Sequence, residues 1–209
     1  MSFAGSENPL SNFFPCSLHV FGVHHQSSEH AFQYVKAIRN GDIQKAQAIQ
    51  DANSALEAKR LGKEIHSSDE FLSKREEVME GILKAKYNQV EEYHAVLKKS
   101  TPSTIYAEAV YDDFWGTGLN RIGTDHTDHN KWPGKNIMGK LSRSISVPRN
   151  TQLSDQRNIS DMLSSIQKND AKKPRTGRNS RNRNTKIVLI QKKNVINLSI
   201  RHIPVAADR

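Results

Sequence analysis

The charged residues of this chain are distributed so unevenly that only one of its two parts is expected to fold. Residues 1–150 hold 18 Lys or Arg and 18 Asp or Glu, so their formal charges cancel. Residues 151–209 hold 13 basic and 4 acidic residues and carry the whole net charge of +9. Only 35% of all residues are hydrophobic, which is low for a chain that packs along its full length. We therefore predict a neutral folded domain over residues 1–149 and a basic, largely disordered tail over residues 150–209.

The single cysteine and the hydropathy pattern limit where such a chain is expected to act. Cys16 is the only cysteine, so no intramolecular disulfide can form and a cysteine-based zinc site is implausible. No apolar run approaches the roughly 18 residues that a membrane span needs, and no signal peptide is recognisable. These features predict no membrane contact and a reducing, intracellular compartment, which is the cytoplasm, or the nucleus if the source is eukaryotic.

Helix-starting residues recur through the first part of the chain. N-cap residues precede the runs with apolar residues at helical spacing: Ser27 or Ser28, Asp42, Ser54, and Ser67 or Ser68. The predicted helices cover residues 28–39, 43–51, 54–62, 69–87 and 91–99, and a last one ends near residue 146. The predicted strands are the short β-like runs at residues 18–23, which Gly22 closes before a His-rich turn over residues 24–26, and at residues 104–110.

The first predicted helix carries a stripe of polar side chains. Glu29, Gln33 and Lys36 recur at i, i+4 and i+7, which places a carboxylate, an amide and an amine on one face. Glu29 also lies in the first turn, where the helix dipole favours a negative charge. Most such stripes are solvated faces, so this one is a candidate site only together with other candidate residues elsewhere in the chain.

Two loops contain such further candidate residues. The strand near residues 104–110 leads into a loop that combines acidic, aromatic and glycine residues over 111–118, a composition typical of active-site loops. Asp112 in this loop is either a chemical group or an ordinary turn former. Gly134 and Asn136, at the mouth of the last helix, either offer backbone N–H groups to a phosphate or only cap the helix.

The role of each remaining polar or aromatic candidate has two interpretations. Phe13 either fills the core or stacks on a ring, and Glu108 either holds the strand-to-loop geometry or faces solvent. Arg75 and Lys86 lie at the edge of the apolar stripe of the longest helix, where each either binds an anion or extends its charged end into water. Asp and His alternate over residues 125–129, but metal ligands usually come from separate rigid elements, so no metal site is predicted.

The tail has features of its own. Residues 154–167 place apolar residues at helical spacing and could form one amphipathic helix. The basic segment 172–193 predicts salt-sensitive, sequence-independent contact with nucleic acid, and a nuclear-localisation or low-complexity extension is the alternative. Two β-like runs, 187–190 and 195–200, could pair as a hairpin, which would need a partner surface because a lone hairpin is marginal in water.

Four segments in this order resemble the NADAR, or YbiA-like, family. They are Pro9-Leu-Ser-Asn-Phe-Phe-Pro15, Ser28-Glu-His-Ala-Phe-Gln-Tyr-Val-Lys36-Ala37, Asp112 followed by Trp115-Gly-Thr-Gly118, and Trp132-Pro-Gly-Lys-Asn136-Ile-Met-Gly-Lys140. Arg75 and Met79 resemble the central helix of that family, whereas Phe71 stands where a Trp is expected. The resemblance covers about residues 3–147 and implies a compact, mainly helical α+β domain.

The resemblance also implies an activity and a set of site residues. It implies hydrolysis of an N-glycosidic bond without a cofactor, in ribosylamino intermediates of riboflavin synthesis or in ADP-ribose attached to guanine. Glu29 and Asp112 are the expected catalytic carboxylates, and by resemblance Lys36 is a further catalytic candidate, as an amine that could trap the opened sugar. The expected substrate-binding residues are Asn12, Phe13, Gln33, Trp115, Gly116 and Asn136. The alternative function is a catalytically inactive module that binds ADP-ribose or nucleic acid.

Overall fold

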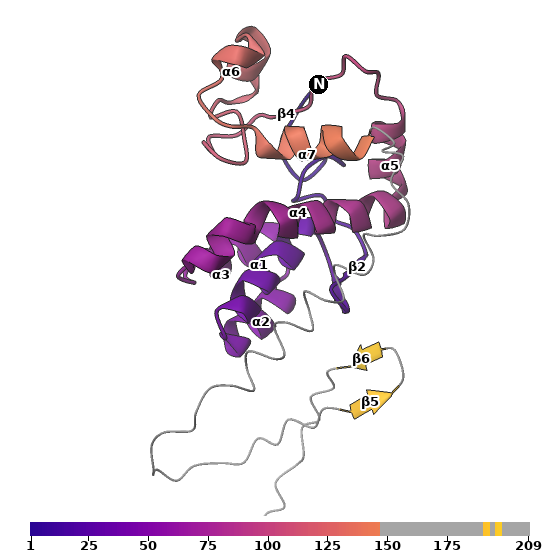
Figure 1. Ribbon diagram of the computed structural model, residues 1–209, viewed down its shortest axis with the longest axis vertical. Coiled ribbons are helices and arrows are strands. Elements are labelled where there is room, and N and C mark those ends of the chain that lie inside the picture. The colour runs from indigo at the N-terminus through magenta and orange to yellow at the C-terminus, as the bar shows by residue number, and fades with distance from the viewer. Residues whose placement is uncertain (147–189, 193–194, 198–209) are drawn as a thin grey trace, which may run out of the picture. The chain divides into compact units, whose positions relative to one another are not determined.

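The computed structural model describes residues 1–146, 190–192 and 195–197 (Figure 1). The chain divides into two units, Met1–Ile166 and Gln167–Arg209, which are described separately. The first unit is mainly helical with a few short strands, which confirms the expected α+β class. The boundary predicted after residue 149 and the amphipathic helix predicted over 154–167 lie outside the described residues.

The helices begin where the sequence places N-cap residues. The side chains of Ser27, Asp42, Ser54 and Ser68 each accept a hydrogen bond from a backbone N–H of the helix that follows. The α-helices are α1 (Ser28–Arg39), α2 (Ile43–Gln50), α3 (Ala55–Lys63), α4 (Asp69–Gln89), α5 (Glu91–Lys98), α6 (Arg121–His126) and α7 (Ile137–Ser146). A 3₁₀ turn, η1 (His129–Lys131), precedes α7.

The strands are shorter than the sequence pattern indicates. Residues 18–23 form a hairpin instead of one strand, with β2 (Leu18–Val20) antiparallel to β3 (Val23–His25). Phe21 and Gly22, both at positive φ, make its turn, so the His-rich segment predicted as a turn lies partly in β3. The run 104–110 narrows to β4 (Ala107–Glu108), which pairs in parallel with β1 (Ser2–Phe3). This pairing brings Phe3 beside Glu108.

Helix α4 is the centre of the first unit. It packs against α7 on one side and α1 on the other, and α2 and α3 lie beyond it next to α1 (Figure 1). Its residues Val78, Met79, Ile82 and Leu83 are buried in the main core. A smaller core, built largely from alanines, lies among α1, α2 and α3 and allows these helices to approach closely.

Lys86 of α4 has neither of the two roles expected for it. Its side chain is fully buried, so it does not extend its charged end into water. Nζ donates a hydrogen bond to the carbonyl of Ser11 at 2.8 Å and lies near the rings of Phe14 and Tyr93. Burial lowers the pKa of this amine to about 8. The buried ammonium fixes the loop that contains Asn12.

The second unit contains the predicted hairpin. Strand β5 (Ile190–Lys192) pairs antiparallel with β6 (Val195–Asn197), so the described part of the hairpin includes Gln191 and Lys192, which the sequence places between the two runs, and residues 187–189 and 198–200 lie outside the described residues. No helix in the described part of the chain is long and apolar enough to cross a membrane.

The burial of His25 predicts loss of stability in acid. This side chain is 1% exposed, and burial, the largest cause, followed by the neighbouring histidines, lowers its pKa from 6.5 to about 3. Its neutral form is required for folding, so its contribution is complete above about pH 6.5 and is lost as the pH falls towards 3. Chemical denaturation should show wild type losing about 2 kcal/mol relative to His25→Leu between about pH 7 and pH 5.

The exposed neighbour His24 provides the matched control for this prediction. His24→Gln should keep the pH dependence of wild type. Parallel curves for wild type and His25→Leu would contradict the argument from burial.

Candidate active site

One cavity of about 340 Å³ brings together segments that are far apart in the sequence. Its wall contains parts of the N-terminal loop, α1, α3, α4, β4 and the loop that follows β4. The residues in this wall are Ala4, Gly5, Ser11, Asn12, Phe13, Glu29, Phe32, Gln33, Lys59, Met79, Glu108, Val110, Asp112 and Trp115. Six of the nine residues predicted for the site are therefore in one wall, and Lys36, Gly116 and Asn136 are not.

The polar stripe of α1 is buried against α3 and is not a solvated face. Glu29 and Gln33 are 6% and 8% exposed, and Gln33 Nε2 donates a hydrogen bond to Glu29 Oε1 at 2.8 Å. Lys36 Nζ donates to the carbonyl of Gly62 at 2.8 Å. A Cβ at Gly62 would lie 1.9 Å from Gln33 Oε1, so glycine is what allows α3 to cover this stripe. The three side chains lie in one row along α1, and only Glu29 and Gln33 reach the cavity.

The N-terminal loop is joined to the start of α1 by its backbone. Glu29 N donates to the carbonyl of Asn12 at 3.0 Å, and Asn12 Nδ2 contacts Met138 Sδ at 3.4 Å. Asn12 Oδ1 is buried in the cavity wall without a hydrogen-bond partner in the described structure. An unpaired buried acceptor is costly, so this oxygen is suited to a donor on a ligand.

Asp112 forms a turn, which is one of its two predicted roles, and it also lines the cavity, where its chemical role stays a prediction. Its Oδ1 accepts hydrogen bonds from Phe114 N at 2.9 Å and Trp115 N at 2.7 Å, which makes it a turn former. The same side chain also lines the cavity. The turn directs Trp115 towards Phe32 of α1, with the ring centroids 5.4 Å apart in an edge-to-face arrangement.

Asn136 and Gly116 stabilise the loop that follows β4 through hydrogen bonds to the backbone. Asn136 Nδ2 donates to Tyr106 O at 2.8 Å, and its Oδ1 accepts from Glu108 N at 3.1 Å, so both ends of the amide are occupied by backbone. Gly116 O accepts from Asn136 N at 2.8 Å, and a Cβ on Gly116 would lie 2.5 Å from Val110. Their place in the structure is support of the wall rather than the predicted contact with substrate.

Glu108 is the carboxyl group whose role the sequence left undecided. It is 7% exposed, it lines the cavity, and its Oε2 has no hydrogen-bond partner among the described residues. Burial, followed by repulsion from Glu29 and Asp112, raises its pKa to about 8. This shift favours the protonated form of Glu108 at neutral pH, in which the group can donate a proton. Its position in a strand gave no signal of this, because the burial comes from the pairing with β1.

Glu29 is the second buried carboxyl group. Burial raises its pKa, and the hydrogen bond from Gln33 and the charge of Lys59 oppose this increase. Lys59 is a cavity residue that sequence reasoning missed, since a lysine in a short amphipathic helix has no distinguishing feature. Its Nζ lies 5.3 Å from the centre of the Phe13 ring. The cavity thus combines three carboxyl groups and one amine.

No group of His, Cys, Asp and Glu in the described part of the chain is arranged to hold a metal ion. In the Asp/His segment, Asp128 caps η1 and His126 Nδ1 contacts the carbonyl of Ile122. These contacts give the segment a local structural role.

Comparison with known proteins identifies relatives of this chain. It is 27% identical over 118 residues to protein irg-1 of Caenorhabditis elegans, a match that covers 54% of this chain and 56% of irg-1. It is 29% identical to riboflavin biosynthesis protein VVA0006 of Vibrio vulnificus, over 63% of this chain and 33% of that protein. The chain thus spans about half or less of the length of these two relatives.

A third relative is also known as a structure. The chain is 30% identical to N-glycosidase YbiA of Escherichia coli over 54% of this chain and 74% of YbiA. The solution structure of YbiA superposes with a TM-score of 0.56 and 25% identity, and covers 78% of this chain and 86% of that one. The NADAR domain itself matches residues 2–146, which include the whole cavity wall. The fold, the cavity and this match together place the chain in the NADAR family.

Proposed function

We propose that this chain hydrolyses the N-glycosidic bond of a ribosyl nucleotide-like substrate inside the cell. The main support for the proposal is that the wall of one cavity contains three carboxyl groups, those of Glu29, Glu108 and Asp112, together with Trp115. Glycoside cleavage needs one carboxylic acid to protonate the leaving group and one carboxylate to stabilise the cationic sugar. A relative named N-glycosidase and another named as a riboflavin biosynthesis protein support this class of reaction.

The proposed reaction assigns a role to each carboxyl group. Glu108 donates its proton to the leaving nitrogen as the C1–N bond breaks and the bonding electrons move to that nitrogen. Glu29 stabilises the oxocarbenium charge at C1 as a carboxylate: burial raises its pKa, and the hydrogen bond from Gln33 and the charge of Lys59 oppose that increase. Asp112 holds Trp115 in place for stacking on the base or sugar. Water then adds to C1 and returns a proton to the Glu108 carboxylate, so no cofactor is required.

Lys36 provides a distinct route that can be tested separately. Burial lowers its pKa, as a nucleophilic amine requires, but its Nζ is hydrogen-bonded to Gly62 and lies outside the cavity wall. We expect Lys36→Ala to reduce turnover by about tenfold through loosening of the row formed by Glu29, Gln33 and Lys36. Borohydride added during turnover should leave wild-type Lys36 unmodified by mass spectrometry. A sugar adduct on Lys36 would instead make it the nucleophile.

The experiment that tests the proposed function offers two substrates separately. Purified protein would be incubated with ADP-ribosylated guanine DNA and with a ribosylamino-pyrimidine phosphate, and the products identified by mass spectrometry. Released ADP-ribose, or released base and ribose phosphate, that disappears in Glu29→Gln would support a glycosidase and name its substrate. Turnover of neither, with ADP-ribose still bound, would favour the inactive binding module.

We propose contact with nucleic acid through residues 172–193 as a separate prediction. Most of this segment lies outside the described residues, and the basis for the proposal is its charge. Affinity for DNA of unrelated sequences should be similar and should fall steeply as salt increases, because binding releases counterions. Binding that does not change with salt concentration would exclude this electrostatic mechanism.

A further inference from the structure

A row of aromatic rings leads from the core past the cavity wall. Phe32 packs edge-to-face on Trp115, which lines the cavity, and Trp115 packs edge-to-face on Phe114 with the centroids 4.8 Å apart. Phe114 is half-buried and is not part of the wall. It is therefore the next ring beyond the cavity.

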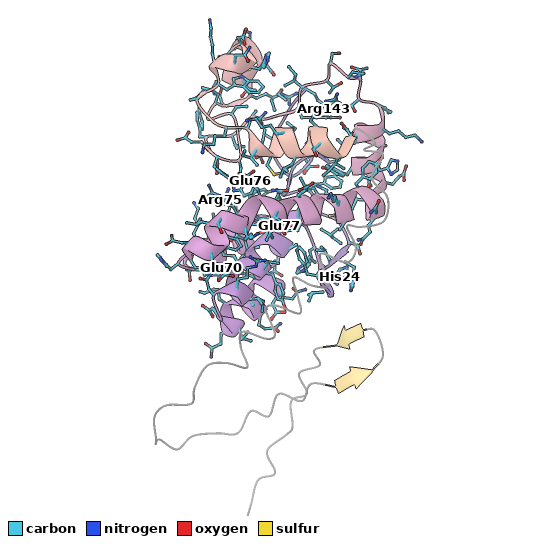
Figure 2. The ribbon with its side chains drawn as sticks, in the orientation of Figure 1. His24, Glu70, Arg75, Glu76, Glu77 and Arg143 are labelled. Atoms are coloured by element: carbon cyan, nitrogen blue, oxygen red, sulfur yellow. The ribbon has the colours of Figure 1, made fainter. Side chains whose placement is uncertain are left out.

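Two cations from distant parts of the chain lie at this ring. The guanidinium carbon of Arg75 is 3.3 Å from the centre of Phe114, and Lys135 Nζ is 5.6 Å from it. Both charges are therefore within about 9 Å of each other. Arg75 is also one helical turn before Met79, which lines the cavity, so the cation pair is adjacent to the wall. Figure 2 labels Arg75 on α4.

Neither cation of this pair has a carboxylate partner within ion-pair distance in the described structure, although α4 carries Glu70, Glu76 and Glu77 (Figure 2). Glu77 pairs with Lys74 instead. Arg75 Nε is buried without a hydrogen-bond partner. Two like charges held at one ring repel each other, and an anion bound close to both would relieve that repulsion.

We propose that Arg75 and Lys135 form a subsite for a phosphoryl group of the substrate. The inference rests on the proposed function and adds the position of the phosphate: the ribose occupies the acidic cavity, and its phosphate lies beyond Trp115 at the cation pair. Arg75 supplies a planar set of donors that matches phosphate oxygens, and Lys135 supplies a point charge. The ligand is either a ribose phosphomonoester or the pyrophosphate of a dinucleotide-like compound, which share this chemistry.

Direct binding tests this subsite without any need for turnover. The full chain would be titrated calorimetrically with ribose 5-phosphate and with inorganic pyrophosphate at about 0.15 M salt, which weakens non-specific attraction of these anions to the basic tail. Arg75→Gln and Lys135→Gln should each weaken binding by about tenfold or more, since a hydrogen bond to a charged group is lost. Lys74→Gln removes the same charge one residue from Arg75 and should bind like wild type. Tighter binding of ribose 5-phosphate than of pyrophosphate would indicate a phosphomonoester substrate, and the reverse order a pyrophosphate.

Equal affinities in wild type, Arg75→Gln and Lys135→Gln would overturn the subsite. Lys135 is exposed, so its variant is expected to fold even if Arg75→Gln does not, and circular dichroism would verify both. With a turned-over substrate, the two variants should raise KM far more than they lower kcat, and the increase should be much smaller for the dephosphorylated compound. Equal increases for both compounds would also reject the subsite. Absence of turnover would count against the proposed function alone, because the binding experiment would still decide the subsite.

Discussion

Glu29→Gln is expected to lower kcat by about a thousandfold while the protein stays folded. The substitution keeps the size of a side chain that is 6% exposed and removes the negative charge proposed to face C1 of the ribose. Gln33 can still form a hydrogen bond, because the new amide oxygen can accept from Nε2 as Glu29 Oε1 does. Single-turnover measurements would isolate bond cleavage from product release.

The matched control for this variant is Glu76→Gln, the same change at an exposed position of α4. It should turn over substrate at the wild-type rate. Circular dichroism and thermal unfolding would establish that Glu29→Gln retains the native fold. A Glu29→Gln protein with wild-type kcat on a demonstrated substrate would remove Glu29 from the mechanism.

Glu108→Gln should lose activity and gain stability in the same variant. The loss of a proton donor is expected to reduce kcat by about 10²–10⁴-fold near neutral pH. Because the pKa of Glu108 is raised from 4.5 to about 8, folding favours its neutral form. The stability of the wild type that depends on this group is complete below about pH 4.5 and is lost as the pH rises through 8. At pH 7 the loss amounts to as much as about 3 kcal/mol, which the uncharged amide avoids.

Two measurements examine this prediction. Wild-type kcat should decline above about pH 8 as Glu108 loses its proton, and the small residual activity of Glu108→Gln should lack that alkaline decline. Urea unfolding at pH 7 should give the variant the higher free energy of unfolding, while at about pH 4 the two proteins should be nearly equal. A variant less stable than wild type at both pH values would mean that favourable contacts stabilise Glu108 in the folded protein. It would contradict the argument that its burial destabilises the charged form.

The sequence was informative where signals are local. N-cap residues located the starts of α1 to α4, and the i, i+4 spacing placed Glu29 and Gln33 side by side before their burial was known. Asp112 was a candidate turn former from its place after a strand, and its hydrogen bonds from Phe114 N and Trp115 N confirm that interpretation. These features depend on residues within a few positions of one another.

What the sequence could not predict depends on distant segments. Glu108 is buried because β1, more than 100 residues earlier, pairs with β4. Asn136 resembled a ligand-binding residue, but the loop before α7 folds against Tyr106 and takes up both ends of its amide. The single strand expected at 18–23 is a hairpin because Phe21 adopts a positive φ that few non-glycine residues adopt.

The close approach of Gly62 to Gln33 restricts how this sequence can change. The space beyond the Cα of Gly62 is already filled by the Gln33 amide, and the carbonyl of the same residue binds Lys36. Any other residue at this position must displace the Gln33 side chain, which donates a hydrogen bond to Glu29. A substitution on α3 would therefore change the position of a proposed catalytic residue on α1. In a library randomised at position 62 and selected for turnover, glycine should be recovered almost alone, even though an unselected library would yield folded proteins with alanine or serine. New substrate specificities would then evolve through substitutions elsewhere in the cavity wall, while the contact between α1 and α3 stays unchanged.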